Sequence, residues 1–276
     1  IYNFYDKCIY LMQTFIFTAF YNFSMKAVIL CAGKGERLKP LTNNIPKPMI
    51  KINNKPILEY LILLCRKHGI KEIFISTSYM SEVIQNYFGD GSKWGVKIQY
   101  SVEDDANLPG TAGAVNRFKS FLDDTFFVIY GDNLTNLNLS KMLDFHRSKN
   151  GIGTIFVYRE PLTDSTSTPA IVAVDSNSEI FDLIERPTES DKERVAKIKL
   201  DEKYMNSGIY VLEPEILKFI PKEKISDFMV DIFPESMKYK KLFAFRDNPY
   251  IREVGIFLRL NKAKEEIESG QVSLDL

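Results

Sequence analysis

Residues 26–42 read KAVILCAGKGERLKPLT, a short apolar stretch that leads directly into a turn rich in small residues. The apolar part, residues 26–31, predicts a strand that is buried on both faces. In the next segment, residues 31–42, small side chains let backbone N–H groups come close to an anionic ligand. A buried strand that ends in such a turn is typical of an α/β sheet, in which ligands bind at the carboxyl ends of the strands.

Two common phosphate-binding motifs do not fit this turn. A dinucleotide fingerprint requires glycine at the position of Leu38, and a P-loop requires Lys-Ser/Thr where Glu36 and Arg37 stand. On these residues alone, an ordinary tight turn between a strand and a helix therefore remains an alternative.

A second cation follows shortly after the turn. The segment IPKPMI, residues 45–50, places Lys47 between two prolines, which stiffen the backbone that carries its ammonium group. A single lysine is most often an ordinary surface residue. Arg37 and Lys47 together would place two positive charges beside the glycine-rich turn, and fixed cations stabilise the charge that builds up during phosphoryl transfer.

The rest of the chain alternates between short β-rich runs and amphipathic helical patterns, which predicts an α/β fold. Core strands are expected at residues 26–31, 72–77, 96–102, 126–130 and 205–212, and helices at 55–68, 81–88, 110–120, 139–149 and 256–269. A small antiparallel β addition is expected at 153–158, 170–174 and 179–185, followed by a loop or short helix at 190–200. We therefore expect residues 25–276 to form one three-layer α/β/α, Rossmann-like domain with a mixed, mostly parallel central sheet.

The overall composition excludes several classes of protein. Lys plus Arg equals Asp plus Glu at 36 each, so no net positive charge favours binding to a nucleic acid backbone. The cysteines Cys8, Cys31 and Cys65 and the histidines His68 and His146 lack the spacing of a disulfide framework or a zinc site. Both histidines are expected to be structural, and no acid–base partner for His146 is evident in the sequence.

Residues 1–24 differ in composition from the rest of the chain, with many aromatic residues and few charges. Polar residues interrupt the apolar run 9–23, which is also too short for a comfortable membrane span. We expect this extension to lie outside the fold and Met25 to be the natural start, with a membrane anchor or a secretion signal as the alternative. On this interpretation the protein is cytoplasmic and makes no stable association with a membrane.

The sequence GKGERLKPLT, followed by IPKPMI, resembles the nucleotide-binding signature of the sugar-nucleotide pyrophosphorylases, or sugar-1-phosphate nucleotidylyltransferases. The resemblance continues in the same order through LPGTAGA (108–114), VIYGDN (128–133), IERP (184–187), MNSGIYVLEPEIL (205–217), DFMVDIFP (227–234) and EVG (253–255). It covers residues 25–264 and is closest to the mannose-1-phosphate guanylyltransferases, including the bacterial heptose-1-phosphate guanylyltransferases. It implies a GT-A-like fold and an enzyme that joins an NTP, with GTP favoured, to a sugar 1-phosphate and releases pyrophosphate.

The same resemblance assigns residues to the reaction. It implies that the nucleotide is bound by Ala32, Gly33, Gly35, Gly110 and Thr111. It also implies catalytic roles for Arg37 and Lys47 at the triphosphate, and for Asp132 at the end of a buried strand. Asp132 and Glu253 would hold Mg²⁺, a hard cation that prefers carboxylate oxygens and bridges to substrate phosphates. Glu253 stands where the family has an aspartate, which is shorter by one methylene.

The resemblance assigns the sugar-phosphate side in the same way, to Glu185, Arg186, Asn206 and Ala170. Arg186 replaces the lysine of the family's Glu-Lys-Pro, and a planar guanidinium binds phosphate differently from a compact ammonium. Ala170 replaces a glycine whose backbone faces the sugar, and Ile256 replaces a threonine. These differences leave the sugar open between mannose 1-phosphate and a related heptose 1-phosphate.

The nucleobase is expected to contact Glu103, or Asp104 or Asp105 if the alignment is slightly shifted. A carboxylate accepts hydrogen bonds, so it complements the N1–H and N2–H₂ donors of guanine. An acidic run in a loop is also commonly a solvated surface. UTP or dTTP with glucose 1-phosphate therefore remains an alternative, as does a non-catalytic nucleotide-sugar sensor, and homo-oligomerisation stays open.

Overall fold

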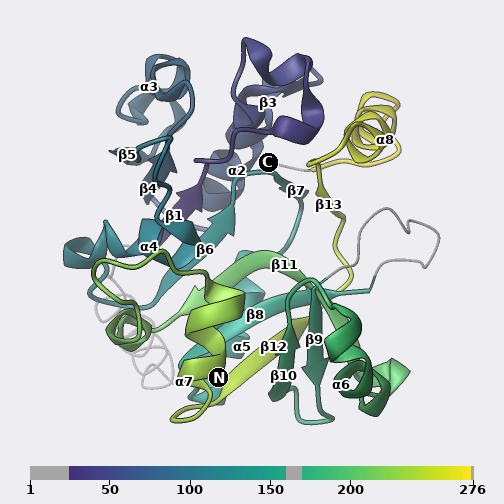
Figure 1. Cartoon of the computed structure of the whole chain (residues 1–276). Coiled ribbons are helices and arrows are strands. Elements are labelled where there is room, and N and C mark those ends of the chain that lie inside the picture. Colours follow the sequence, from purple (N-terminus) through teal and green to yellow (C-terminus); the bar gives the residue numbers. More distant parts are fainter. Residues whose placement is uncertain (1–24, 160–169, 275–276) are drawn as a thin grey trace, which may run out of the picture.

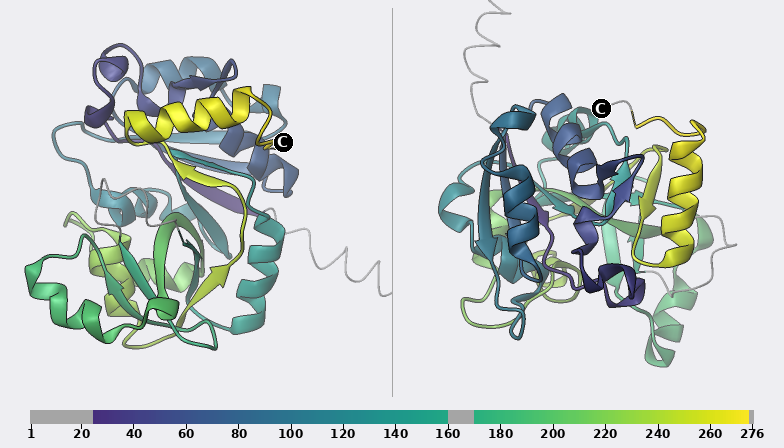
Figure 2. Two further views of the ribbon diagram at one scale, coloured as in Figure 1. Left: turned by 90° about the vertical axis from the view of Figure 1, so that its right-hand side faces the viewer. Right: turned by 90° about the horizontal axis from the view of Figure 1, so that it is seen from above.

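The computed structural model describes residues 25–159 and 170–274, so the N-terminal extension lies outside the described residues. Within these ranges a mixed nine-stranded sheet forms the centre of the molecule, with helices on both faces (Figure 1, Figure 2). Its first half is parallel: β1 (Lys26–Leu30) lies between β4 (Glu72–Thr77) and β6 (Phe126–Tyr130), and β5 (Lys97–Val102) pairs with β4. The predicted α/β architecture with a mixed central sheet is confirmed.

The second half of the sheet contains the predicted antiparallel addition. Strand β11 (Lys203–Leu212) runs antiparallel to β6, β8 (Gly153–Tyr158) and β9 (Ile171–Val174), and β9 pairs antiparallel with β10 (Ile180–Ile184). Strand β12 (Leu242–Arg246), which was not among the expected strands, adds to β8 in parallel. Residues 209–212 of β11 pair with β6, whereas residues 203–205 pair with β9. Strand β11 therefore joins the two halves of the sheet.

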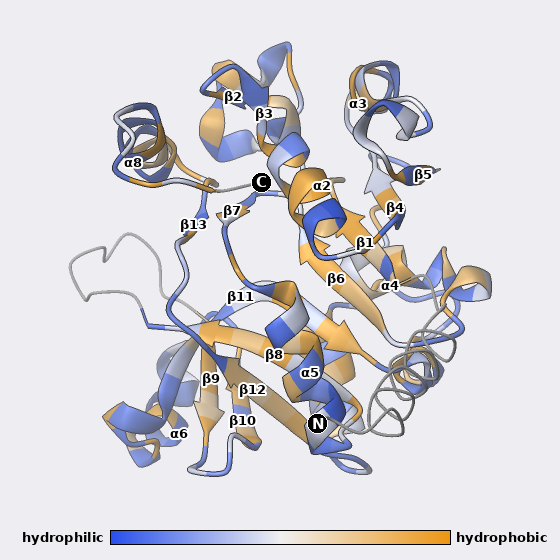
Figure 3. Cartoon of the chain, turned by 180° about the vertical axis from the view of Figure 1, so that it is seen from behind, coloured by the Kyte–Doolittle hydropathy of each residue, from blue (hydrophilic) through white to orange (hydrophobic). Residues whose placement is uncertain are grey.

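Helices cover both faces of this sheet. One face is covered by α2 (Ile57–Lys67), α3 (Ser81–Phe88) and α5 (Leu139–Lys149). The other is covered by α4 (Gly110–Asn116), a π-helical turn (Phe228–Ile232) and α7 (Phe233–Ser236). In β1 the Ile29 side chain lies in one hydrophobic cluster and that of Val28 in the other. The central strands β1 and β6 are largely apolar, as their orange arrows in Figure 3 show, because both of their faces are buried.

A third, smaller hydrophobic cluster holds the C-terminal helix α8 (Phe257–Glu268) against the first half of the molecule. It also includes Ile52 of β2 (Lys51–Ile52), which pairs with β3 (Lys55–Pro56), and Leu134 of β7 (Asn133–Thr135), which pairs with β13 (Ile251–Glu253). Leu38 and Val254 are buried in this cluster. They directly follow Arg37 and Glu253, so the cluster fixes the backbone on which two predicted site residues are carried.

Two predicted helical segments differ in length from the expectation. The helix predicted at 110–120 ends at Asn116, because the N–H groups of Arg117 and Phe118 bond to carbonyls only three residues back. In the charged segment 190–200, the short helix α6 (Lys192–Lys197) follows a 3-10 turn. No helix in the described part of the chain is long and apolar enough to cross a membrane.

The buried side chain of His146 on α5 links this helix to the sheet. Its Nδ1 lies 2.9 Å from the hydroxyl of Thr154 on β8, and its Nε2 lies 2.9 Å from Oε1 of Glu213, directly after β11. Thr125 donates a further hydrogen bond to the same Glu213 oxygen. His146 is therefore structural, as expected, but the impression from the sequence that it lacks an acid–base partner is wrong. The partner was missed because it lies 67 residues away in the chain.

We expect Glu213→Gln to destabilise the protein at neutral pH by about 1–2 kcal/mol, since the bond to a buried histidine is weakened. The hydrogen bond from His146 is the main cause that lowers the pKa of Glu213 below 4.5. This stability is present above pH 4.5 and is lost as the pH falls through the lower pKa of the folded state. Thermal melts from pH 3.5 to 8 should therefore show a difference from the wild type that shrinks only in acid.

The matched control for this prediction is Glu215→Gln, which removes a carboxylate that pairs with Lys240 at the surface. Its melting curve should follow that of the wild type at neutral pH, because exposed ion pairs add little stability. A Glu213→Gln protein that melts like this control at pH 7 would contradict the proposed role of the His146 contact.

Candidate active site

A cavity of about 270 Å³ lies at the carboxyl ends of β1 and β6. This is the edge of the sheet at which a ligand was expected to bind. The cavity is lined by residues 30–33, 47–48, 108–111 and 130–132, together with Ser76, Ala114 and Asp227. Segments that are far apart in the sequence, including the GKGERLKPLT, IPKPMI and LPGTAGA motifs, therefore share one wall.

Two of the three residues predicted to be catalytic, Lys47 and Asp132, meet in this cavity. The ammonium of Lys47 lies 2.5 Å from Oδ2 of Asp132, and the two side chains are only 14% and 17% exposed. Lys47 begins a 3-10 turn (Lys47–Met49), whereas Asp132 directly follows Gly131 at the end of β6. The close pair places one fixed positive and one fixed negative charge at the cavity wall.

The backbone of the glycine-rich turn packs against the residue that carries this ammonium. Gly35 has φ +67°, and a Cβ added there would lie 2.9 Å from Thr42 Cγ2 and 3.2 Å from Lys47 Cβ. The carbonyl of Gly35 also accepts a hydrogen bond from the Thr42 hydroxyl. Gly33 differs, because a Cβ there would have no protein atom within 4 Å. Gly35 therefore holds the turn against Lys47, while Gly33 leaves open space in the cavity.

Arg37 and Glu253 lie beside this cavity and do not line it. Arg37 Nη2 is 3.6 Å from one carboxylate oxygen of Glu253, and Arg259 donates to the other at 2.6 Å. The backbone brings Glu253 close to the cavity, because the N–H of Val254 bonds to the carbonyl of Asp132 at 2.9 Å. Arg37 is thus joined to the Lys47–Asp132 pair through Glu253 and the pairing of β13 with β7.

The local chemistry suits a cation that needs few protein ligands. Among the described residues no group of three or more His, Cys, Asp or Glu side chains could form a closed metal site. Asp132 and Glu253 offer two carboxylates on adjoining chain segments. Mg²⁺ usually takes one or two carboxylates and completes its shell with water and substrate phosphates, so these residues fit it.

Asp227 is a cavity residue that we did not single out from the sequence. One of its carboxylate oxygens accepts hydrogen bonds from both the N–H and the hydroxyl of Thr111, each at 2.9 Å. The Thr111 hydroxyl also accepts from the N–H of Phe228. Gly110 has φ +78°, and an added Cβ would lie 2.4 Å from the carbonyl oxygen of Ser226. The motifs LPGTAGA and DFMVDIFP are therefore in contact. The second motif, which contains Asp227, was visible in the sequence and could have pointed to this residue.

The acidic run 103–105 lies next to the cavity but does not line it. The Glu103 side chain is 3% exposed; it accepts from Ser101 at 2.9 Å and from Ser76, a cavity residue, at 3.5 Å. Arg117 lies 3.4 Å from its other oxygen. Asp105 pairs instead with Lys34 of the glycine-rich turn at 3.1 Å. Glu103 is thus held by protein donors, and Asp105 ties its loop to the turn.

Asn206, which was predicted for the sugar-phosphate side, lies where the register of β11 shifts against β8, and two tyrosines connect it to the cavity. The Asn206 side chain accepts from the N–H of Gly208 and donates to the Tyr210 hydroxyl, each at 3.0 Å. Tyr210 in turn donates to the hydroxyl of Tyr130, which lines the cavity, at 3.3 Å. Burial raises the pKa of Tyr130 to about 12, so its phenol is neutral at physiological pH. This chain of contacts connects Asn206 to the cavity wall.

Glu185 and Arg186 lie at the end of β10, where the chain leaves the sheet. Glu185 is partly buried, and this burial raises the pKa of its carboxyl. Arg186 is 90% exposed and has φ +47°. Ala170, the fourth predicted residue of this group, immediately precedes β9 and is half-buried. These residues come from neighbouring strands of the antiparallel addition.

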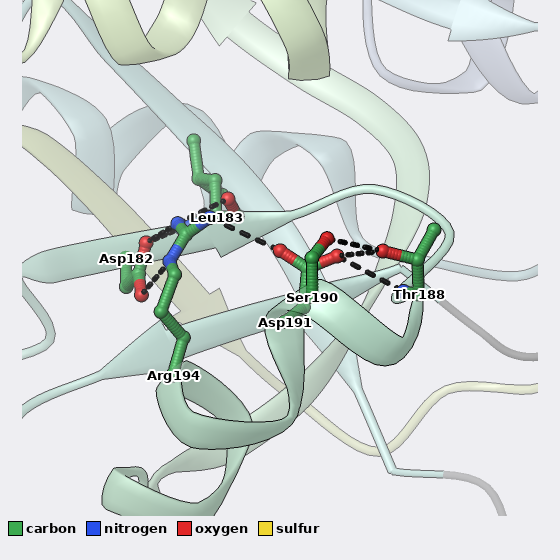
Figure 4. Close-up of polar contacts among 6 residues, drawn as sticks. All are labelled: Asp182, Leu183, Thr188, Ser190, Asp191 and Arg194. Carbon is green, nitrogen blue, oxygen red and sulfur yellow. Dashed lines mark hydrogen bonds and ion pairs between the residues drawn. The ribbon is translucent and has the colours of Figure 1, made fainter.

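The segment after Arg186 is fixed by its own polar network (Figure 4). Arg194 on α6 contacts both carboxylate oxygens of Asp182 on β10 and donates to the carbonyl of Leu183 at 3.2 Å. Asp191 accepts from the N–H and the hydroxyl of Thr188 at 2.9 and 2.8 Å, which lowers the pKa of its carboxyl. The network anchors the segment that follows Arg186 to strand β10.

A family model described as Nucleotidyl transferase matches residues 26–270. The chain belongs to the nucleotidyl transferase family. A D-glycero-alpha-D-manno-heptose 1-phosphate guanylyltransferase from Campylobacter jejuni is 34% identical over 233 residues, which cover 84% of this chain and 95% of the relative. A UTP–glucose-1-phosphate uridylyltransferase from Synechocystis sp. is 38% identical over 221 residues. The resemblance inferred from the motifs is confirmed.

The extent of the sequence alignments and the similarity to a solved structure agree with membership of the nucleotidyl transferase family. The match to the Synechocystis relative covers 76% of this chain, which spans 55% of that relative's length. The crystal structure of HddC from Yersinia pseudotuberculosis has a TM-score of 0.71 at 25% identity, covering 88% of this chain and 99% of HddC. HddC has also been solved complexed with GMP-PN.

Gly208 should be indispensable to the link between β11 and the cavity. It has φ +71°, and an added Cβ would lie 2.6 Å from the Tyr130 ring. We expect Gly208→Ala to cost about 3 kcal/mol in urea unfolding, from left-handed strain together with overpacking. Gly69→Ala is the matched control, because Gly69 has φ +76° with no atom within 4 Å of an added Cβ. Equal losses in the two variants would refute close packing of Gly208 on Tyr130.

Proposed function

We propose that this nucleotidyl transferase moves a nucleoside monophosphate from an NTP, with GTP favoured, to a sugar 1-phosphate. The products are an NDP-sugar and pyrophosphate. The observation that carries the proposal is the Lys47–Asp132 pair on the wall of the cavity, which the start of the glycine-rich turn also lines. Family membership and the named relatives support the same class of reaction.

The reaction would be a direct displacement at the α-phosphorus of the NTP. An oxygen of the sugar phosphate attacks in line, the bond to the bridging oxygen of the β-phosphate breaks, and pyrophosphate leaves with that electron pair. Lys47 supplies a fixed positive charge next to the reacting phosphate, and the open backbone at Gly33 admits the triphosphate. The protein thus acts by positioning the substrates and by neutralising charge.

Arg37 acts from the edge of the cavity in this proposal. Its side chain is 63% exposed, so it can turn toward a bound triphosphate without breaking a buried contact. Asp132 and Glu253 would hold Mg²⁺, which neutralises charge on phosphate oxygens when bound. Glu253 is kept in place by Arg259, so its longer side chain is not free to swing away.

The sugar phosphate would bind on the antiparallel addition. Asn206 and Glu185 would contact sugar hydroxyls, and Arg186 would contact the phosphate, consistent with its exposed guanidinium. The anchored segment around Arg194 keeps the Glu-Arg-Pro backbone in a defined position for this contact. A mannose 1-phosphate or a related heptose 1-phosphate is the preferred acceptor, because the Campylobacter relative acts on a heptose 1-phosphate.

GTP is favoured over the other triphosphates on two grounds. The Campylobacter relative is a guanylyltransferase, and HddC was solved with GMP-PN. The acidic loop 103–105 also stands next to the cavity, where a carboxylate complements guanine. Because Glu103 is held by Ser101 and Arg117, we assign it to shaping the base pocket together with Ser76, which lines the cavity.

The second candidate is a uridylyl- or thymidylyltransferase that uses glucose 1-phosphate. The specific observation in its favour is the 38% identity to the Synechocystis uridylyltransferase.

For both candidate functions we place the reaction in the cytoplasm. Cys31 and Cys65 are free, buried thiols, which suits a reducing compartment.

The deciding experiment is a substrate panel with the purified chain and pyrophosphate release as the readout. GTP, UTP, dTTP and ATP are each combined with mannose 1-phosphate, D-glycero-α-D-manno-heptose 1-phosphate or glucose 1-phosphate. We expect release with GTP and one of the first two acceptors, and only when Mg²⁺ is present. Release with UTP and glucose 1-phosphate would establish the second candidate. Tight NDP-sugar binding without release in any combination would show a sensor instead of an enzyme.

Asp132→Asn should lower kcat/KM by roughly 10³-fold or more, because it removes the charge that the cavity presents to a metal and to Lys47. The fold should survive, since Asp132 lies at a cavity wall and outside the three hydrophobic clusters. Asp123→Asn removes the same charge at the opposite end of the sheet, where Asp123 pairs with Lys26. Full activity in Asp132→Asn, or equal losses in both variants, would rule out the proposed role.

A further inference from the structure

A second and larger cavity, of about 650 Å³, lies on the face formed by the ends of β8 and β12, strand β13 and the start of α8. The left view of Figure 2 faces this side of the molecule, with β13 and α8 in yellow. None of the residues that line it also lines the first cavity, at the carboxyl ends of β1 and β6. Its size is that of a site for a metabolite.

The charge of this second cavity is strongly unbalanced. Its charged lining residues are Arg159, Arg246, Arg252, Arg259, Lys262 and a single carboxylate, Asp247. Part of the positive charge is neutralised by residues outside the cavity. Arg252 contacts both carboxylate oxygens of Glu266 at 3.0 and 2.9 Å, and Arg259 donates to Glu253 at 2.6 Å.

Arg159 and Arg246 are different, because neither has a carboxylate partner in residues 25–159 and 170–274. Arg159 donates to the backbone carbonyls of Asp201 and Lys203. Arg246 donates to the hydroxyl of Ser178 at 2.7 Å. Both side chains are exposed, and the acceptors that they contact are neutral. The positive charge of the two arginines therefore remains available to a ligand.

The ring of Tyr204 contacts both of these guanidinium groups. The guanidinium carbon of Arg159 lies 4.3 Å from the ring centroid, and that of Arg246 lies 5.8 Å from it. Attraction between cation and ring holds each group in place. Guanidinium groups that are already held lose little freedom when an anion binds to them.

We propose that this cavity is a second anion-binding site that takes a diphosphate group, with Arg159 and Arg246 as its main ligands. Planar guanidinium groups bind phosphate oxygens through paired hydrogen bonds, so two of them match a ligand with two phosphates. The chain as a whole has no net charge, which favours a small ligand over a nucleic acid. The site is separate from the acceptor residues Glu185 and Arg186, which lie at the end of β10.

The site also has a physical connection to the proposed active site. Arg259 lines the second cavity and donates to Glu253, which Arg37 approaches from its other side. A diphosphate bound beside Arg259 therefore lies one side chain away from a proposed Mg²⁺ ligand. The diphosphate could be pyrophosphate or the diphosphate of an NDP-sugar, and the test separates these two sources.

The test is titration calorimetry with inorganic pyrophosphate in the absence of Mg²⁺. The wild type should bind at two sites, Lys47→Ala should keep the second site, and Arg159→Ala/Arg246→Ala should lose it. We expect affinity at that site to fall by roughly tenfold or more, since two charge-assisted contacts are removed. The control Lys71→Ala/Lys97→Ala removes two exposed positive charges at the β4–β5 edge and should bind like the wild type.

Three results would overturn the proposal: unchanged pyrophosphate binding in Arg159→Ala/Arg246→Ala, equal weakening in the Lys71→Ala/Lys97→Ala control, or a raised KM for the sugar 1-phosphate in the arginine variant. The last result would assign these arginines to the acceptor site. Failure of the proposed function is read separately, from turnover and from Lys47→Ala. In Lys47→Ala, GDP-mannose binding tighter than pyrophosphate would identify an NDP-sugar ligand, and weaker binding would identify pyrophosphate; both results support the site.

Discussion

The contact between the Lys47 ammonium and the Asp132 carboxylate organises the nucleotide half of this molecule. The two residues are separated by 85 positions in the chain and lie 2.5 Å apart. To bring them together, a buried parallel strand must place Asp132, and a proline-flanked turn must place Lys47, at the same cavity. At this distance the attraction between the two charges offsets part of the water that each has lost at the cavity wall. The glycine turn, the β7–β13 pair and the third hydrophobic cluster all hold parts of this arrangement in place.

Most of the regular fold follows from local sequence pattern. The strands at Glu72–Thr77 and Phe126–Tyr130 and the helices at Ser81–Phe88 and Leu139–Lys149 have the bounds that periodicity predicts. Strand Leu242–Arg246 was missed, because it is short and is formed only by pairing with β8. Helix α4 was predicted too long, since the apolar spacing continues past Asn116 although the backbone tightens into 3-10 turns.

Part of the candidate site could also be predicted from local sequence patterns. Lys47, Asp132, Gly33 and Thr111 stand in motifs, and motifs with fixed roles tend to converge at the carboxyl edge of the sheet. The contacts that no local pattern encodes were missed: Asp227 reaches Thr111 across 116 residues, and Glu103 is satisfied by Arg117 on a neighbouring element. Such pairings depend on how elements pack, which a single sequence does not specify.

On the proposed function, β11 divides substrate recognition between two parts of one strand. Its later residues pair with β6 and β8, next to the cavity at the carboxyl ends of β1 and β6, and its earlier residues pair with β9 in the antiparallel addition. The buried side chains of β8, β9 and β10 share hydrophobic clusters with those of β1 and β6, so only their solvent-facing positions can change without disturbing that packing. On the proposed function, a protein built in this way can acquire a new sugar specificity through those positions while the phosphate chemistry of the other half is inherited unaltered.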